Sequence, residues 1–263
     1  MELTFYKYEG AGNDFVLLDD RKIQFPHTRS DLVKFICDRR FGIGADGLML
    51  LRPLNGYDYK MVYYNADGNE STMCGNGGRC LAAFAQKLGI IDKKAIFTAA
   101  DGVHEAELLT DNYVRLKMTD VTKIETGKDY YYLNTGVPHY VKFMSSINDL
   151  DVYNEGRKIR YNERFADQGT NVNFVQEYPD HISVRTYERG VENETLACGT
   201  GIVASVICTG IRKGINHGSY SSKVHAQGGQ LKVSFFRIDN KITNIWLEGP
   251  ATFVFKGTIN LAL

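Results

Sequence analysis

The sequence lacks the features that mark several large classes of protein. Lysine plus arginine and aspartate plus glutamate are balanced at 31 each, so the formal net charge is zero and no attraction to nucleic acid or to an anionic membrane is expected. The longest apolar runs, such as Ile202–Cys208, are far too short to span a bilayer. Neither a basic nor an apolar segment opens the sequence, so no secretion signal is expected.

Cysteine is scarce, and its spacing is not that of a disulfide or zinc protein. Five cysteines, an odd number at low density, favour reduced thiols and a cytoplasmic location. The sequence has no CxxC pair, so we expect no metal site. Cys37, Cys80 and Cys208 are expected to be small core residues, because free cysteine is among the most buried residue types.

Two stretches of the chain share one design, Met73–Cys80 and Ala197–Ile202. In each, a cysteine (Cys74 or Cys198) precedes a glycine-rich turn that leads directly into an apolar helix. The segments before the two cysteines, Tyr64–Gly68 and Tyr187–Gly190, also resemble each other. This pattern predicts one structural unit used twice, and therefore two similar halves that each contribute a cysteine.

A cysteine at the start of a helix is chemically biased. Unpaired backbone N–H groups and the helix dipole stabilise its thiolate and lower the thiol pKa. The glycines let a ligand approach the backbone, so that its carboxylate can rest on the same N–H groups. Two such sites in opposition would suit removing a proton from one face of a carbon and adding one to the other. Neither turn matches a P-loop or a dinucleotide fingerprint.

Periodicity predicts an α+β fold of short strands and few helices. A first helix is expected over 30–40 with Ser30 as its N-cap, and a charged helix near 148–157. The cysteine helices should end near Leu88 and Lys213, each followed by a C′ glycine. Turns are expected at 228–229, 239–240 and 249–250. Strands are expected within 3–19 and near 48–52, 59–65, 95–100, 103–109, 113–119, 130–134, 138–144, 171–177, 181–187, 219–226, 229–236, 242–248 and 251–256.

Both cysteine helices are apolar nearly all round, so they must be enclosed. Because the surrounding segments are short strands, each half is expected to be a barrel-like, mainly antiparallel sheet wrapped around a central helix. The expected domains are residues 1–119, carrying Cys74, and residues 120–254, carrying Cys198. The last strand, near 255–263, is free to return to the first half.

Eight short motifs with polar or glycine residues follow one another along the chain: Gly10–Phe15, Arg40–Gly47, Asn65–Gly68, Cys74–Gly77, Pro138–His139, Thr170–Asn173, Tyr187–Gly190 and Cys198–Gly201. Taken together, they resemble the signatures of the diaminopimelate epimerases, and the match runs from end to end. Any one motif is weak. Eight in order, with a cysteine in both glycine turns, form a specific pattern.

The resemblance implies two pseudo-symmetric halves and an enzyme that interconverts LL- and meso-2,6-diaminopimelate. The reaction would use no pyridoxal phosphate or metal, and it belongs to lysine and peptidoglycan precursor biosynthesis. Cys74 and Cys198 would be the base and acid pair, and His139 and Glu188 would tune their thiols. The remaining matched positions would bind substrate, through distal groups at Asn13, Asn65, Asn171, Glu188 and Arg189 and through N–H donors at Gly75, Asn76, Gly199 and Thr200. A homodimer is a further expectation, with the oligomeric state itself left open.

Two positions depart from the family pattern. Many relatives carry asparagine where this chain has Val137, and some carry glutamine where it has Gly47. At Val137 one substrate hydrogen bond of the family is missing or supplied by another group, and the contact of the glutamine cannot be carried over to Gly47.

Four other functions fit parts of the pattern. A cysteine hydrolase needs one thiolate and a histidine base, which leaves the second cysteine turn unexplained. A redox dithiol protein explains both cysteines but not the polar ligand-reading residues, and a non-enzymatic binding protein explains the reverse. The strongest alternative is a related racemase of proline, hydroxyproline or histidine. Glu188 and Arg189 with the asparagines suit a substrate with a second amino-acid head, which favours diaminopimelate.

Overall fold

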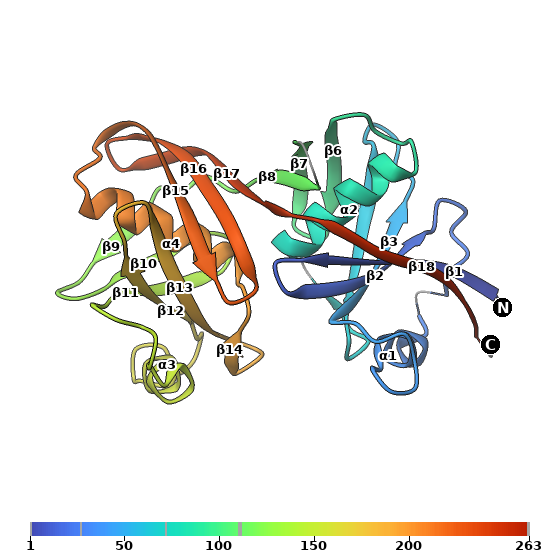
Figure 1. Ribbon diagram of the computed structural model, residues 1–263, viewed down its shortest axis with the longest axis horizontal. Coiled ribbons are helices and arrows are strands. Elements are labelled where there is room, and N and C mark those ends of the chain that lie inside the picture. The colour runs from blue at the N-terminus through green and yellow to red at the C-terminus, as the bar shows by residue number, and fades with distance from the viewer. Residues whose placement is uncertain (1, 27, 72, 110–111, 262–263) are drawn as a thin grey trace. The chain divides into compact units, whose positions relative to one another are not determined.

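The computed structural model describes residues 2–26, 28–71, 73–109 and 112–261 (Figure 1). These residues form 18 strands and four helices. The chain divides into two compact units, Met1–Leu116 with Gly249–Leu263 (unit 1) and Lys117–Glu248 (unit 2). No helix among the described residues is long and apolar enough to cross a membrane.

Unit 1 contains the first half of the chain and the final strand. Its helices are α1 (Ser30–Cys37) and α2 (Gly75–Lys87). Its strands are β1 (Glu2–Gly10), β2 (Asn13–Asp19), β3 (Gly47–Arg52), β4 (Tyr59–Asn65), β5 (Glu70–Ser71), β6 (Lys94–Ala99), β7 (Gly102–Leu108), β8 (Tyr113–Lys117) and β18 (Thr252–Asn260).

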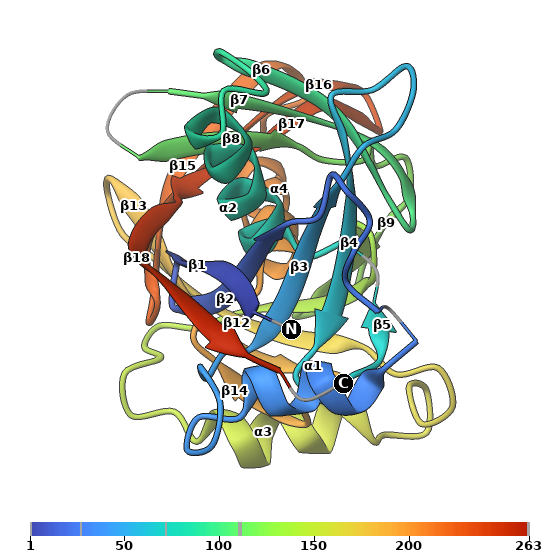
Figure 2. The same ribbon diagram turned by 90° about the vertical axis from the view of Figure 1, so that its right-hand side faces the viewer.

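The sheet of unit 1 curves around α2. Strand β2 pairs antiparallel with β1 and parallel with β3, β3 pairs antiparallel with β4, and β4 runs parallel to β6. The α2 helix contacts β1, β2, β3, β7 and β18, and Figure 2 shows these strands around it. Leu81 and Phe84 on α2 are fully buried, and burying a side chain of this size contributes about 2 kcal/mol.

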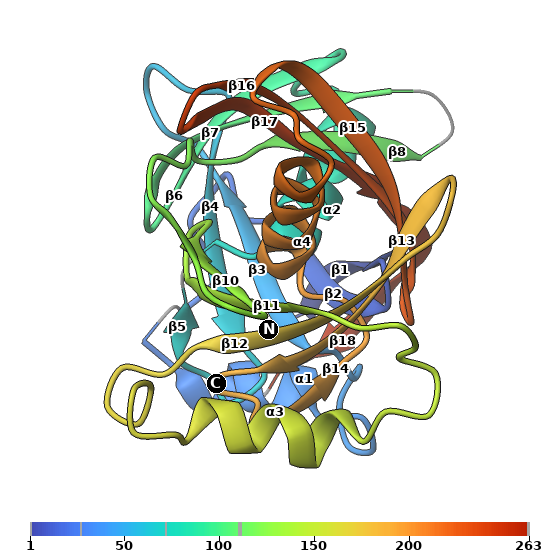
Figure 3. The same ribbon diagram turned by 90° about the vertical axis from the view of Figure 1, so that its left-hand side faces the viewer.

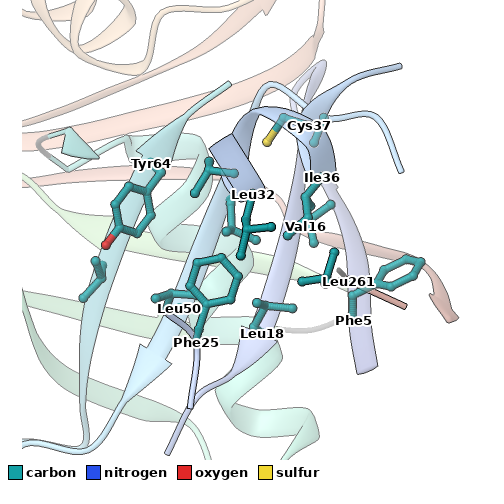
Figure 4. Packing of buried hydrophobic residues seen from close by; sticks show 14 residues of the cluster. Phe5, Val16, Leu18, Phe25, Leu32, Ile36, Cys37, Leu50, Tyr64 and Leu261 are labelled. Atoms are coloured by element: carbon teal, nitrogen blue, oxygen red, sulfur yellow. The ribbon is translucent and has the colours of Figure 1, made fainter. Parts of the chain in front are cut away.

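The α1 helix covers the outer face of the same sheet. Figure 4 shows Leu32 and Ile36 of α1 packed with Val16, Leu18 and other side chains of a buried apolar cluster. This is the second face of a sheet whose first face meets α2. Residues of β2 and β3 are therefore buried on both sides, as in a three-layer arrangement.

Unit 2 repeats this arrangement. Its helices are α3 (Val152–Arg160) and α4 (Gly199–Arg212). Its strands are β9 (Ile124–Thr126), β10 (Tyr131–Asn134), β11 (Pro138–Phe143), β12 (Asn171–Glu177), β13 (His181–Glu188), β14 (Asn193–Thr195), β15 (His217–Ala226), β16 (Gly229–Ile238) and β17 (Lys241–Pro250).

The order of strand pairing is the same in both units. Strands β11 and β12 are parallel, β12 and β13 antiparallel, and β13 and β15 parallel, which matches β2–β3, β3–β4 and β4–β6. The α4 helix contacts β10, β11, β12, β13, β15 and β16 and lies among them in Figure 3, with α3 outside β12 and β13. The α+β class, the two similar halves and the enclosed central helices are confirmed.

The cysteine helices end as predicted. The α2 helix has Leu88 at its C-cap, followed by Gly89 at φ 69°. The α4 helix has Lys213 at its C-cap, followed by Gly214 at φ 76°. Both glycines adopt the left-handed conformation that closes a helix at little cost.

The limits of two predicted helices and one predicted turn were wrong. Ser30 is the first helical residue of α1, which ends at Cys37 because the Asp38 carboxylate accepts the N–H groups of Arg40 and Phe41. The charged helix is α3, at 152–160, because Asp151 caps it by accepting the N–H of Asn154. Residues 249–250 make no turn. They end β17, and one residue separates them from β18.

The expected domain limits, 119/120 and 254/255, remain predictions. The compact units change at 116/117, within β8, and at 248/249, within β17. The chain therefore enters and leaves unit 2 along strands rather than through linkers, which is why no Ser/Pro-rich segment marks either crossing. The returning strand, β18, pairs with β1 in unit 1.

Candidate active site

Three neighbouring strands of unit 2 carry His139, Asn171 and Glu188 side by side. His139 of β11 pairs with Asn171, the first residue of β12. Asn171 precedes the Val172–Tyr187 pair, which places it beside Glu188 at the end of β13. The strand pairing thus brings together three predicted site residues that are far apart in the sequence.

Cys198 is the N-cap residue of α4 and lies near Asn171. It is 7% exposed, and its Sγ lies 3.5 Å from Thr200 Oγ1 and 4.0 Å from Asn171 Nδ2. The backbone N–H of Arg189 donates to Asn171 Oδ1 at 2.8 Å. This bond turns the amide NH₂ of Asn171 towards the sulfur, so two polar side chains face Cys198.

His139 is fully buried beneath the same helix turn. Its Nε2 lies 2.9 Å from Thr200 Oγ1, and its Nδ1 lies 3.1 Å from Asn173 Nδ2. Burial, with a smaller contribution from the charge of Arg189, lowers the pKa of His139 to about 3. The imidazole is therefore neutral at neutral pH, and its link to Cys198 runs through Thr200.

We expect His139 to make the stability of the protein fall in acid. The unfolded histidine takes up a proton below its ordinary pKa of 6.5, whereas the folded one does so only near 3. Since the unfolded state binds more protons in that window, the free energy of unfolding decreases as the pH falls through it. His139→Gln keeps a donor that does not titrate. Urea unfolding should therefore show wild type losing more stability than this variant between about pH 7 and pH 4, and parallel losses would contradict the assignment.

Glu188 and Arg189 take different partners. Glu188 Oε2 accepts the hydroxyl of Thr195 at 3.0 Å, and burial raises the pKa of its carboxyl. Arg189 Nη1 donates to the carbonyl of Gln168 at 2.7 Å. Each side chain thus has a hydrogen-bond partner other than its neighbour, so adjacency in sequence does not make them an ion pair. Their joint role at the distal end of a ligand remains a prediction.

In unit 1, Cys74 occupies the corresponding place. It is the half-buried N-cap of α2. Two residues further on, the Asn76 side chain donates to Asn13 Oδ1 at 2.6 Å, and Asn13 donates to Asp46 Oδ2 at 2.9 Å. Asn13, the first residue of β2, is thus hydrogen-bonded to the helix turn that contains the predicted site residues Cys74, Gly75 and Asn76.

Asn65 ends β4 and pairs with Gly47. A Cβ at position 47 would lie 2.5 Å from Tyr63 Cε2 and 2.6 Å from the carbonyl oxygen of Tyr64. Tyr63 therefore occupies the space of a side chain at this position, which explains why glycine stands here. The other departing residue, Val137, is half-buried just before β11.

Arg79 lies in the first cysteine turn, and the sequence pattern predicts no role for it. It is fully buried, and it donates to Asn76 Oδ1 at 2.8 Å and to the carbonyls of Gly75 and Pro250 at 3.4 Å. Its guanidinium therefore holds the turn that carries Cys74. The signal that the sequence does contain is a single arginine between the glycines and the apolar run of the cysteine helix.

Replacing Arg79 with methionine should lower the free energy of unfolding by about 2–3 kcal/mol. The Asn76 side-chain oxygen and the two carbonyl oxygens that accept its hydrogen bonds would stay buried without a donor. Urea unfolding measures the loss. The matched control is Arg164→Met. Arg164 makes an exposed ion pair with Glu125 at 2.6 Å, and its loss should cost less than about 1 kcal/mol. Equal losses in the two variants would contradict this role of Arg79.

The other three cysteines are buried, as predicted. Cys80 and Cys208 are fully buried and Cys37 is 3% exposed, and burial raises the pKa of all three thiols, that of Cys37 to about 12. None of the five cysteines forms a disulfide. Among the described residues, no group of three or more histidine, cysteine, aspartate or glutamate side chains is placed to hold a metal ion.

Comparison with known proteins identifies the family. A family model described as diaminopimelate epimerase matches residues 5–124 and 131–254. The chain belongs to the diaminopimelate epimerase family. It is 50% identical to the diaminopimelate epimerase of Flavobacterium psychrophilum, over 98% of this chain and 100% of that relative. It is 42% identical to the diaminopimelate epimerase of Chlorobaculum tepidum, over 96% and 99%.

Solved structures show the fold of this diaminopimelate epimerase family member in more distant proteins. A phenazine biosynthesis protein of the PhzF family from Bacillus anthracis matches with a TM-score of 0.74 at 12% identity, over 99% of this chain and 100% of that one. A probable proline racemase from Agrobacterium radiobacter matches with a TM-score of 0.70 at 15% identity, over 99% and 93%. At such low identity these matches concern the fold alone.

Proposed function

We propose that this protein is a cofactor-independent isomerase that interconverts LL- and meso-2,6-diaminopimelate, in lysine and peptidoglycan precursor biosynthesis. The main observation behind the proposal is found in both units: each places a cysteine at the N-cap of its enclosed central helix. Membership of the diaminopimelate epimerase family supports the substrate. A racemase of proline, hydroxyproline or histidine is not favoured.

The proposed chemistry is proton transfer by Cys74 and Cys198 at one α-carbon. The thiolate of one cysteine takes the α-proton and becomes a thiol, and the thiol of the other gives its proton to the opposite face and becomes a thiolate. An α-proton is very weakly acidic, so the carbanion must be stabilised by preformed donors and kept from water. The N–H groups of Gly75–Asn76 and Gly199–Thr200, in the first turns of the two helices, are the proposed donors.

The remaining predicted residues are proposed to recognise the second amino-acid head of the substrate. Asn13 and Asn65 belong to unit 1, and Asn171, Glu188 and Arg189 to unit 2. A substrate without that head would leave Arg189 or a carboxylate unpaired, so its transition state should be disfavoured by about 3–5 kcal/mol. A cytoplasmic location and a homodimer complete the proposal, and sedimentation of the purified protein tests the dimer.

The function is tested by deuterium incorporation. Purified protein is incubated in deuterated water with diaminopimelate and, separately, with alanine, lysine, proline, hydroxyproline and histidine. Mass spectrometry should find α-deuterium in diaminopimelate, and chromatography should find its LL and meso forms interconverted. Comparable exchange in alanine or lysine would make the substrate assignment wrong, and exchange in proline or histidine alone would favour the related racemases. A cysteine hydrolase, redox protein or binding protein would show no exchange.

A further inference from the structure

Asn173 is a fully buried amide next to the candidate site. It lies two residues after Asn171 on β12, and therefore on the same face of the strand. Its Nδ2 donates to the carbonyl of Tyr140 at 3.1 Å and lies 3.1 Å from His139 Nδ1. Its Oδ1 accepts the hydroxyl of Thr186 at 2.9 Å. All the polar atoms of this side chain are thus engaged.

These contacts determine which nitrogen of His139 carries the hydrogen. A backbone carbonyl can only accept, so the NH₂ of Asn173 must face Tyr140, and its second hydrogen then points at His139 Nδ1. Nδ1 is therefore an acceptor, and the neutral ring carries its hydrogen on Nε2. That hydrogen is donated to Thr200 Oγ1 at 2.9 Å.

The hydroxyl of Thr200 then has its own hydrogen available for sulfur. Thr200 Oγ1 receives one hydrogen from His139 and lies 3.5 Å from Cys198 Sγ. When Cys198 is a thiolate, the hydroxyl can donate to it. When Cys198 is a thiol, the second lone pair of the hydroxyl can accept its hydrogen. Rotation of one hydroxyl serves both states, and His139 needs no change of protonation.

The fold does not require this polar network, because the equivalent positions of unit 1 are apolar. In the matching strand register, Phe15 stands for His139 and Met49 stands for Asn173. The central helices show the same contrast. A Cβ on Gly77 would meet Met49 and Phe15, whereas a Cβ on Gly201 would meet Asn173 Oδ1 at 2.2 Å and His139 Cε1 at 3.3 Å.

We propose that Asn173 is a positioning residue for the reaction: it fixes His139 as the Nε2–H tautomer, and His139 in turn holds the hydroxyl of Thr200 as a hydrogen-bond partner of the Cys198 sulfur. This deepens the proposed function and rests on it for its catalytic meaning. Arg189 and Glu188 are the charged groups beside His139 and Asn171. Neither forms part of the chain from Asn173 to Cys198.

The first half of the proposal is tested without substrate, by nitrogen-15 NMR of histidine-labelled protein at neutral pH. His139, assigned with His139→Gln, should show a bare Nδ1 and a protonated Nε2. In Asn173→Asp the carboxylate can only accept, so Nδ1 should become protonated. A protonated Nδ1 in wild type, or a bare Nδ1 in a folded Asn173→Asp protein, would overturn the proposal. If that variant does not fold, the wild-type spectrum still decides.

The second half is tested by following the titration of Cys198 with carbon-13-labelled cysteine. Thr200→Val should raise the midpoint by roughly one pH unit, since the thiolate loses a hydrogen bond from a hydroxyl. Thr209→Val is the matched control. Its hydroxyl lies on the same helix and donates to the carbonyl of Ser205 at 2.8 Å, so the midpoint should not move. Equal midpoints in wild type and Thr200→Val would overturn this half.

Both readouts are independent of catalysis, so the two proposals can fail separately. A protein that epimerises diaminopimelate but carries the hydrogen of His139 on Nδ1 contradicts only the role of Asn173. A protein with the expected tautomer and titration that does not exchange the α-proton contradicts only the proposed function.

Discussion

Changing either Cys74 or Cys198 to serine is expected to lower epimerisation by about 10³- to 10⁴-fold, the range for losing a general acid or base. A hydroxyl of similar size keeps the N-cap geometry, but it is a far weaker acid than a thiol and rarely ionised. Chromatographic separation of LL and meso substrate measures the loss. The other cysteines of the two helices, Cys80 and Cys208, are fully buried further along them, so neither is placed to replace the N-cap thiol.

Cys37→Ala is the matched control for this experiment. Cys37 is buried in the apolar cluster under α1, at the end of a helix rather than at its start. Its variant should lose some stability through a small cavity and keep nearly all of its specific activity. Near-normal turnover in either serine variant would contradict the two-base proposal. An equal loss in Cys37→Ala would show that the activity follows general stability instead.

Features encoded by neighbouring residues could be predicted from the sequence. The central helices combine a glycine turn, an apolar run and a C′ glycine, and each of these signals is local. The ends of both helices therefore match the sequence prediction at Gly89 and Gly214. The division into two similar halves could also be predicted, because the repeated cysteine turn is visible in the sequence without knowing how the strands pair.

Features that depend on strand register could not be predicted. Asn173 is one of three similar polar residues in Thr170–Asn173. Only the pairing of β12 with β11 and β13 brings it within hydrogen-bond distance of His139 and Thr186. Similarly, strands β5 and β14 have two and three residues, too few for a periodic pattern. The residues at 249–250 look like a turn by composition, yet in the structure they continue β17.

The two units surround their cysteines with different side chains, and the sequence alone does not show which positions correspond. Gly47 of unit 1 and Asn171 of unit 2 occupy equivalent positions, because each begins the second strand of a parallel pair in the repeated strand order. The sequence shows both residues, but not that they are equivalent. Once they are aligned, the difference between the units becomes clear: polar groups surround Cys198, and a buried arginine holds the turn of Cys74.

The glycine three residues after each cysteine provides a direct comparison of the two units. Gly201→Ala should lower kcat by about 10²-fold, the effect of displacing reacting groups by about 1 Å. The new Cβ would lie 2.2 Å from Asn173 Oδ1, and this amide is held by its hydrogen bonds to Thr186 and Tyr140. The amide must shift, and His139 and Thr200 shift with it.

Gly77→Ala should have a much smaller effect on kcat. Its Cβ would lie 1.8 Å from Met49 Cε, but that atom is the end of an unbranched, flexible side chain that can adopt another rotamer. Alanine is the better helix former at both positions by about 1 kcal/mol, so neither variant is expected to unfold. Steady-state kinetics and thermal unfolding of the two proteins make the comparison, and equal losses of kcat would contradict it.

A double variant distinguishes the steric effect of the Asn173 amide from its hydrogen bond to His139. Asn173→Ala in the Gly201→Ala protein removes the colliding amide and leaves room for the new methyl group. If the amide acts only as an obstacle, kcat should return towards that of wild type. If it positions His139, kcat should stay at least as low as in Gly201→Ala although the collision is gone, because Nδ1 of His139 then has no donor to fix the tautomer. Recovery of kcat in the double variant would show that His139 needs no help from Asn173.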